Sequence, residues 1–240
     1  MTRNSMIARF AAGWLVAIGA VGCGPPPIGP PPGPPPGAKG QPLRPEPSPF
    51  VAMPLHRPDE GDRAALPDMV KANNAFAVDL YHRMRREPGN LLVSPTSLAV
   101  GLAMLRAGAR GETAAEIDRA LHRSDRLADA GLAALMRDLN DDGSDLSFQI
   151  RLADAVWFQE GYPILDAYRR TLHDVFALDD ERRVDFNGHP DRAAAFINDW
   201  IFERTGGKIA GAIAPEAVRP PTKMVLTSAL YFRGGWSERF

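Results

Sequence analysis

The stretch Thr222-Lys-Met-Val-Leu-Thr-Ser-Ala-Leu-Tyr-Phe-Arg-Gly-Gly-Trp236 has the pattern of one long β-strand. Apolar side chains recur at every second position on one face, and most residues between them, from Val225 to Tyr231, are apolar too. A strand with two apolar faces belongs at the centre of a large sheet that is covered on both sides. Between Met224 and Phe232, the first face carries one polar residue, Ser228, whose hydroxyl needs a hydrogen-bond partner if it is buried.

A second long strand is expected over residues 146–158. The apolar residues that alternate along it are Leu146, Phe148, Ile150, Leu152, Val156 and Phe158. Asp154 falls on that apolar face. A buried carboxylate is costly unless it is paired, so we expect either a donor beside Asp154 or a wetter face than the pattern indicates.

The spacing of apolar residues predicts helices over residues 69–86, 95–107, 113–121, 126–139, 163–176 and 189–204, with short strands at 90–93 and 183–186. Ser94 and Pro95 suit an N-cap and a first helical position, and the run from Thr113 to Glu116 has the pattern of a capping box. The helix over 189–204 should end at Gly206 and Gly207. These elements predict a mixed α/β fold of the α+β type, with helices packed on a large central sheet.

Composition divides the chain into a tail and a body. The chain has 240 residues, a net charge of -1 and 45% hydrophobic residues, which fits one sizeable domain and excludes the basic footprint typical of nucleic-acid binding. Sixteen of the 23 prolines lie between Pro25 and Pro67, so we expect the globular domain over residues 68–240. The single cysteine, Cys23, lies outside that domain, which excludes an intramolecular disulfide and a multi-cysteine zinc site.

Residues 1–22 have the pattern of an export signal. Arg3 and Arg9 precede a short apolar run that ends Ala20-Val-Gly-Cys23. This ending resembles the cleavage box of bacterial lipoproteins, although Ala20 stands where that box usually has leucine; an ordinary signal peptide with a chance cysteine is the alternative. We expect an exported protein, extracellular, at the cell surface or in the periplasm, with a lipid on Cys23 that anchors it to the membrane.

The segment over residues 23–67 should be a solvated linker. It is rich in proline and poor in apolar side chains, which disfavours both packing and regular structure. In polyproline form, at about 3.1 Å per residue, it would hold the body up to about 130 Å from its anchor. A spacer is favoured over a ligand for proline-binding domains because no repeated motif has basic or aromatic flanks.

Five motifs in the body together resemble the N-terminal half of a serpin, the serine protease inhibitor family. They are Asn74-Ala-Phe-Ala-Val-Asp-Leu-Tyr81, Asn90-Leu-Leu-Val-Ser-Pro-Thr-Ser97, Gly111-Glu-Thr-Ala-Ala-Glu-Ile117, Ile197-Asn-Asp-Trp-Ile-Phe-Glu-Arg-Thr-Gly-Gly-Lys-Ile209 and the strand over 222–236. The resemblance implies that the two long strands are neighbours in the central sheet, with the helix over 189–204 across its face. The sheet would be incomplete at the C-terminal end of this chain.

The resemblance also implies roles for single residues. Ser94, Ser97 and Ser228 would form the polar cluster beneath the sheet that is called the shutter in serpins, which would give Ser228 its partner. The family usually has asparagine at position 228, and Asp154 likewise replaces a common asparagine. Trp236 matches the tryptophan at the top of the sheet, where loop insertion begins.

The implied activity is inhibition of a serine protease, with cysteine proteases as a second class. A serpin presents a reactive loop as bait, is cleaved to an acyl-enzyme and inserts the cut loop beside the strand that begins at Thr222, which traps the protease. The family's bait loop lies beyond the half that is matched, so no scissile bond is assigned. We expect no cofactor and no nucleic-acid partner.

An enzyme is not expected. There is no Gly-x-Ser-x-Gly or His-Glu-x-x-His motif, the five histidines are scattered, and an N-cap role explains Ser94, so no catalytic or metal residue is assigned. Two alternatives stay open: a serpin-fold lipoprotein that binds at the cell surface without inhibiting, and a truncated, non-functional fragment. For this 240-residue chain expressed without its signal, we expect an unpaired strand edge between Met224 and Phe232, and therefore aggregation or a molten state.

Overall fold

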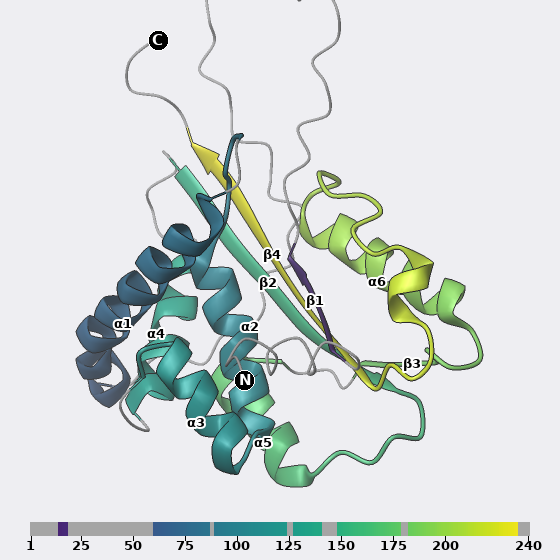
Figure 1. The fold of residues 1–240 in the computed structure, drawn as a ribbon, viewed down its shortest axis with the longest axis horizontal. Helices are drawn as coiled ribbons and strands as arrows, with labels where there is room; N and C mark the ends of the chain where they lie inside the picture. Colours follow the sequence, from purple (N-terminus) through teal and green to yellow (C-terminus); the bar gives the residue numbers. More distant parts are fainter. Residues whose placement is uncertain are drawn as a thin grey trace, which may run out of the picture.

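The computed structural model describes residues 14–18, 60–86, 89–123, 127–140, 148–178 and 182–234. Its elements are β1 (Trp14–Ile18), α1 (Glu60–Met84), α2 (Pro95–Gly108), α3 (Gly111–Ala120), α4 (Leu127–Asn140), β2 (Phe148–Gln159), α5 (Asp166–Phe176), β3 (Arg182–Val184), α6 (Pro190–Arg204), the 3-10 helix η2 (Pro215–Val218) and β4 (Met224–Gly234). Figure 1 shows α1 to α5 gathered on one side of the sheet and α6 on the other. The predicted α+β class is confirmed.

The sheet has the strand order β1-β4-β2-β3. Strands β2 and β4 are antiparallel neighbours, paired from Phe148 opposite Gly234 to Phe158 opposite Met224. The short β3 runs parallel to the end of β2, and β1 runs parallel to the start of β4. The two long strands predicted from alternation are therefore the central pair of this sheet.

Each face of the central pair has its own core. Val156, Phe158, Met224 and Leu226 pack with apolar residues of α1, α2, α4 and α5. The alternate residues, Trp157 and Val225 among them, pack against α6. Because successive strand residues point to opposite faces, the alternation in sequence becomes two separate cores.

Helix ends show where local rules held. Ser94 caps α2 with Pro95 as the first helical residue, as predicted. At the end of α6, Gly206 and Gly207 have φ of 58° and 75°, a conformation that suits glycine, and the Gly207 N–H donates to Phe202 O at 2.8 Å.

Other predicted boundaries are wrong. Helix α3 begins at Gly111 after Arg110, so the run from Thr113 lies inside the helix and is no capping box. Helix α1 begins at Glu60 and contains Pro67, so it starts nine residues before the predicted 69. Helix α5 begins at Asp166, not at 163.

The predicted strand over 90–93 is absent, because none of the described strands pairs with this segment. Its side chains are mostly exposed to solvent as well, and Leu92 is 73% exposed. Hydrophobicity alone therefore did not place this segment in a sheet. The other predicted short strand forms as β3 but ends at Val184 instead of 186.

The outer edge of β4 is paired over part of its length. Strand β1 pairs with it from Trp14 opposite Met224 to Ile18 opposite Ser228. Because β1 lies within the predicted signal, this pairing does not test the prediction of an open edge for the chain without it. Among the described strands, none pairs with that edge from Ala229 to Gly234. The rest of the predicted signal, Cys23, most of the linker and Trp236 lie outside the described residues.

Candidate functional site

The first turn of α2 carries two of the predicted shutter serines. Ser94 Oγ accepts a hydrogen bond from the Ser97 backbone N–H at 3.3 Å, and the two hydroxyl oxygens lie 2.9 Å apart. Ser97 is buried. Nearby, Asn73 Nδ2 donates to Thr96 Oγ1 at 3.1 Å and ties α1 to the same turn. This turn of α2 is therefore fixed by side-chain hydrogen bonds.

Asp154 and Ser228 meet at the middle of the central strand pair. They are direct cross-strand partners in β2 and β4, and they are only 4% and 8% exposed. Asp154 Oδ1 and Oδ2 and Ser228 Oγ have no hydrogen-bond partner among the described residues. The bond expected from Ser228 to Ser94 or Ser97 is thus not formed here, and the shutter role of the three serines stays a prediction.

Burial controls the acidity of Asp154. Loss of hydration raises its pKa from 3.8 to about 7, and the nearby Ser228 hydroxyl offsets the rise only in part. Neither sequence expectation is met in full, because Asp154 is buried and no described residue gives its carboxyl oxygens a hydrogen bond. Burial instead favours the neutral, protonated carboxyl of Asp154 up to about neutral pH.

The opposite face of the strand pair is built differently. Trp157 is fully buried, and its Nε1–H donates to Thr227 Oγ1 at 3.0 Å. The indole also packs edge to face against Trp200 of α6, with ring centroids 5.6 Å apart, and Arg182 lies over both rings. Here an aromatic cluster with a paired N–H holds α6 to the sheet.

Buried Gln159 organises the end of β2. Its Oε1 accepts from the Phe186 N–H at 2.8 Å, and its Nε2 donates to Asp185 Oδ1 at 3.1 Å. Asp185 also accepts from the Gly188 N–H at 2.8 Å, and these bonds, that from Gly188 first, lower the pKa of its carboxyl. The side chain thus fixes the turn between β3 and α6.

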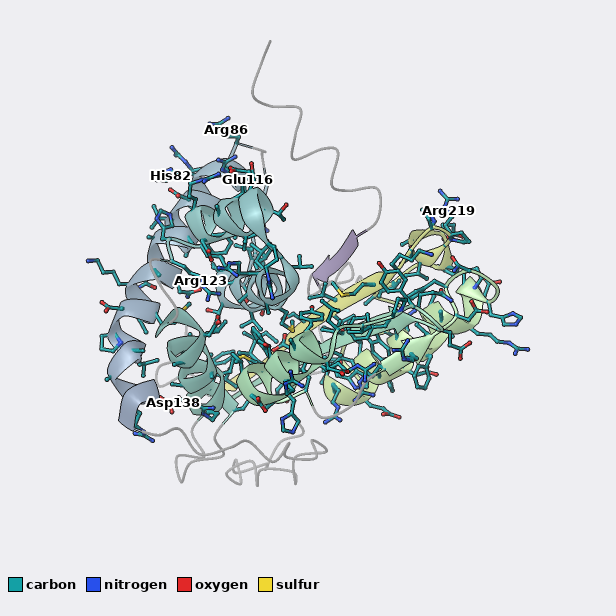
Figure 2. All side chains as sticks on the ribbon, turned by 90° about the horizontal axis from the view of Figure 1, so that it is seen from below. His82, Arg86, Glu116, Arg123, Asp138 and Arg219 are labelled. Carbon is teal, nitrogen blue, oxygen red and sulfur yellow. The ribbon has the colours of Figure 1, made fainter. Side chains whose placement is uncertain are left out.

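An ion network joins the helices of the other layer. Arg106 Nε donates to Asp118 Oδ2 at 2.7 Å, and Arg123, whose side chain is 5% exposed, pairs with Asp129 and lies 3.8 Å from Asp118. Figure 2 shows Arg123 within this helical layer and Asp138 on its outer side. The network links α2, α3 and α4 and has the form of a structural contact.

The described residues contain no group of three or more His, Cys, Asp or Glu side chains that could hold a metal ion. Two histidines in that part of the chain contact single carboxylates, His122 with Asp79 and His173 with Asp174, each at 2.8 Å. None of the helices described is both long enough and apolar enough to cross a membrane.

Comparison with known proteins identifies the architecture. The sequence model of the family Serpin (serine protease inhibitor) matches residues 71–240. The chain belongs to the serpin family. It is 37% identical over 175 residues to an uncharacterized serpin-like protein of Thermococcus kodakarensis, a match that covers 72% of this chain and 40% of that protein. It is 36% identical over 171 residues to the leukocyte elastase inhibitor of Bos taurus, which covers 70% of this chain and 45% of the inhibitor.

Solved serpin structures have the same arrangement. Emu ovalbumin superposes with a TM-score of 0.66 at 25% identity, over 72% of this chain and 48% of ovalbumin. Human thyroxine-binding globulin superposes with a TM-score of 0.63 at 26% identity, over 73% of this chain and 48% of the globulin. The chain thus spans less than half the length of these relatives, and it matches the part of the serpin fold that contains the central strand pair.

Sequence reasoning singled out Asp154 and Ser228 separately but did not pair them. It missed the Trp157–Thr227 bond and the role of Gln159. The available signal was Thr227, a polar residue on the second face of a strand with two apolar faces. Gln159, next to Phe158 at a strand end, carried the same kind of signal because it is a polar residue that follows a buried run.

Proposed function

We propose that the full-length protein to which this chain belongs inhibits a serine-type protease by trapping it. The observation that carries the proposal is the match of residues 71–240 to the serpin family, together with 36% identity to a leukocyte elastase inhibitor. Proteins of this family act through a sheet and a loop and need no catalytic group of their own. The target class is serine proteases, with cysteine proteases second.

The outer edge of β4 is where the cleaved loop would insert into the sheet of this chain. In the proposed reaction the protease cleaves the bait loop and remains bound to it as an acyl-enzyme, and the cut loop then adds to the sheet beside β4. Strand β1 occupies that edge from Met224 to Ser228, so an inserted strand would have to replace it there; beyond Ser228, none of the described strands pairs with this edge of β4. The two cores on either side of β2 and β4 would hold the sheet while the strand enters.

The test is to incubate the full-length protein with elastase-like, trypsin-like and subtilisin-like serine proteases. Trapping predicts a complex that survives denaturing electrophoresis, with loss of protease activity at a stoichiometry near one. A protease whose serine is already blocked is the control and should give no such complex. Cleavage of the protein without a stable complex by every protease would overturn the proposal.

A binding protein that does not trap proteases is the second candidate. It is favoured by the similarity to thyroxine-binding globulin, whose structure was solved as a complex with thyroxine. Under this alternative the protein would be a substrate of the proteases above. The melting temperature of the cleaved protein also distinguishes an inhibitor from a binding protein. Insertion of the cut loop raises the melting temperature, whereas cleavage without insertion does not.

We also propose that the protein is exported and held at the membrane by a lipid on Cys23, with the part of the linker that precedes α1, residues 23–59, as the spacer. Export and the lipid anchor rest on the sequence pattern alone. Detergent-phase partitioning and metabolic labelling with a fatty acid should both be lost in Cys23→Ala. Serine at the same position is the matched control for size, and membrane partitioning that is unchanged in both variants would reject the anchor.

A further inference from the structure

Asp154 and Ser228 combine three features at one point of the sheet. They lie directly opposite each other on the two central strands, both are buried, and their side-chain oxygens have no hydrogen-bond partner among the described residues. An unpaired polar group in such a place is costly, and a charge there is far more costly. The strand pair therefore tolerates the neutral carboxylic acid much better than the carboxylate.

Charged neighbours do not relieve this cost. The two helices that pack directly on the strand pair carry Arg106 in α2 and Asp129, Arg137 and Asp138 in α4. The charged side chains described on α1 and α5, which complete this layer, are all exposed: Arg63, Asp68, Lys71, Asp79, His82, Arg83, Asp166, Arg169, Arg170, His173 and Asp174. Arg106 is bound to Asp118, Asp129 is bound to Arg123, and Asp138 is exposed. Among the described residues, burial and the Ser228 hydroxyl are the causes of the shift in the pKa of Asp154, and no charged side chain contributes to it.

We propose that Asp154 and Ser228 make the β2–β4 pair a proton-sensitive joint, which stays closed while the carboxyl is neutral and opens locally once it is charged. Opening lets water reach the carboxylate and removes the desolvation cost. Ser228 moderates the switch because its hydroxyl can donate to the carboxylate. The proposal concerns the sheet itself and does not depend on protease inhibition.

The expected midpoint lies near neutral pH. The pKa of Asp154 is about 7 in the closed sheet, against 3.8 for a hydrated aspartate. If the carboxyl is hydrated in the open form, the equilibrium constant for opening rises about tenfold between about pH 6 and about pH 8. Above the closed-state pKa both forms are charged and the dependence levels off. An exported protein would meet this range of pH outside the cell.

Hydrogen exchange of the full-length protein tests the joint. The amides of residues 152–156 and 226–230 should lose about tenfold protection between about pH 6 and about pH 8, after correction for the intrinsic exchange rate. Asp154→Asn should abolish this dependence. Asp138→Asn, which removes an exposed carboxyl from α4, is the matched control and should leave it unchanged. Equal protection at both pH values in the parent, or an unchanged dependence in Asp154→Asn, would overturn the proposal.

Ser228→Ala gives a second, independent test, because it should shift the pH at which protection is lost. Without the hydroxyl that lowers the pKa of Asp154, the loss of protection should move to higher pH. If a variant does not fold, infrared difference spectra of the parent still decide the matter. A buried protonated carboxyl should give a C=O band at about pH 5.5 that disappears by about pH 8.5. A spectrum in which all carboxylates are already ionised at about pH 5.5 would refute the joint.

Discussion

The two faces of the β2–β4 pair differ in how their buried polar side chains are hydrogen-bonded. On the α6 face, Thr227 accepts the indole N–H of Trp157 at 3.0 Å, so a buried donor and a buried acceptor satisfy each other. One residue further along β4, Ser228 faces Asp154 on the other side, and neither has a hydrogen-bond partner among the described residues. The first face is built for stability, whereas the second holds a group that changes state near neutral pH.

The α6 face should be the more sensitive to truncation. Trp157→Ala removes a fully buried side chain and its contacts with Trp200 and Thr227, so we expect a loss of about 3–5 kcal/mol in the free energy of unfolding. Chemical denaturation of the full-length protein measures it. Phe196→Ala is the control, because Phe196 contacts the same indole but is 55% exposed, and it should cost about 1 kcal/mol or less. Equal costs would mean that the cluster does not hold α6.

The other face should respond to pH. Between pH 3.8 and about 7 the folded protein holds a proton on Asp154 that the unfolded chain has released. The free energy of unfolding therefore falls as pH rises through this window, by up to about 1.4 kcal/mol per pH unit, and levels off above it. Asp154→Asn should remove this component and stabilise the protein at about pH 8 by roughly 2–4 kcal/mol. Thermal unfolding at about pH 5 and about pH 8 checks the sign, and a variant less stable than the parent at about pH 8 would contradict it.

Removing the acceptor on the paired face should have an intermediate effect. Thr227→Val keeps the size and branching of the side chain but leaves the Trp157 N–H buried without its partner. We expect a loss of about 1–3 kcal/mol that does not depend on pH, because neither group titrates in the accessible range. Near-UV circular dichroism of the tryptophans, measured along the unfolding curve, reports the site directly. A cost near zero would show that the hydrogen bond adds nothing beyond packing.

Alternation predicted the two strands and the face on which Asp154 and Ser228 lie, because a period of two is a local property. It did not predict that they are partners, since register depends on how two distant strands align. The expected bond from Ser228 to α2 illustrates this, as Ser94 and Ser97 bond each other and Ser228 faces Asp154.

Local sequence signals also gave wrong element boundaries where backbone geometry or the lack of a partner strand determined the structure. The run from Thr113 to Glu116 has the composition of a capping box, yet α3 begins earlier, at Gly111. Gly111 has a φ of 59°, a left-handed conformation that suits glycine and lets the chain turn into the helix at this residue. The segment 90–93 has strand composition but no described strand beside it, and composition alone supplies no partner.

The smallest effect is expected at the residue next to Thr227. Ser228 Oγ makes no hydrogen bond with the described residues, so Ser228→Ala leaves no described partner unsatisfied. At about pH 5, where Asp154 is neutral, we expect a change of less than about 0.5 kcal/mol in the free energy of unfolding. At about pH 8 the cost should grow towards about 1 kcal/mol, because the carboxylate then loses the hydroxyl that lowers its pKa. Parallel denaturation of Thr227→Val and Ser228→Ala at both pH values therefore separates a hydrogen bond that acts at every pH from a hydroxyl that acts only on a charge.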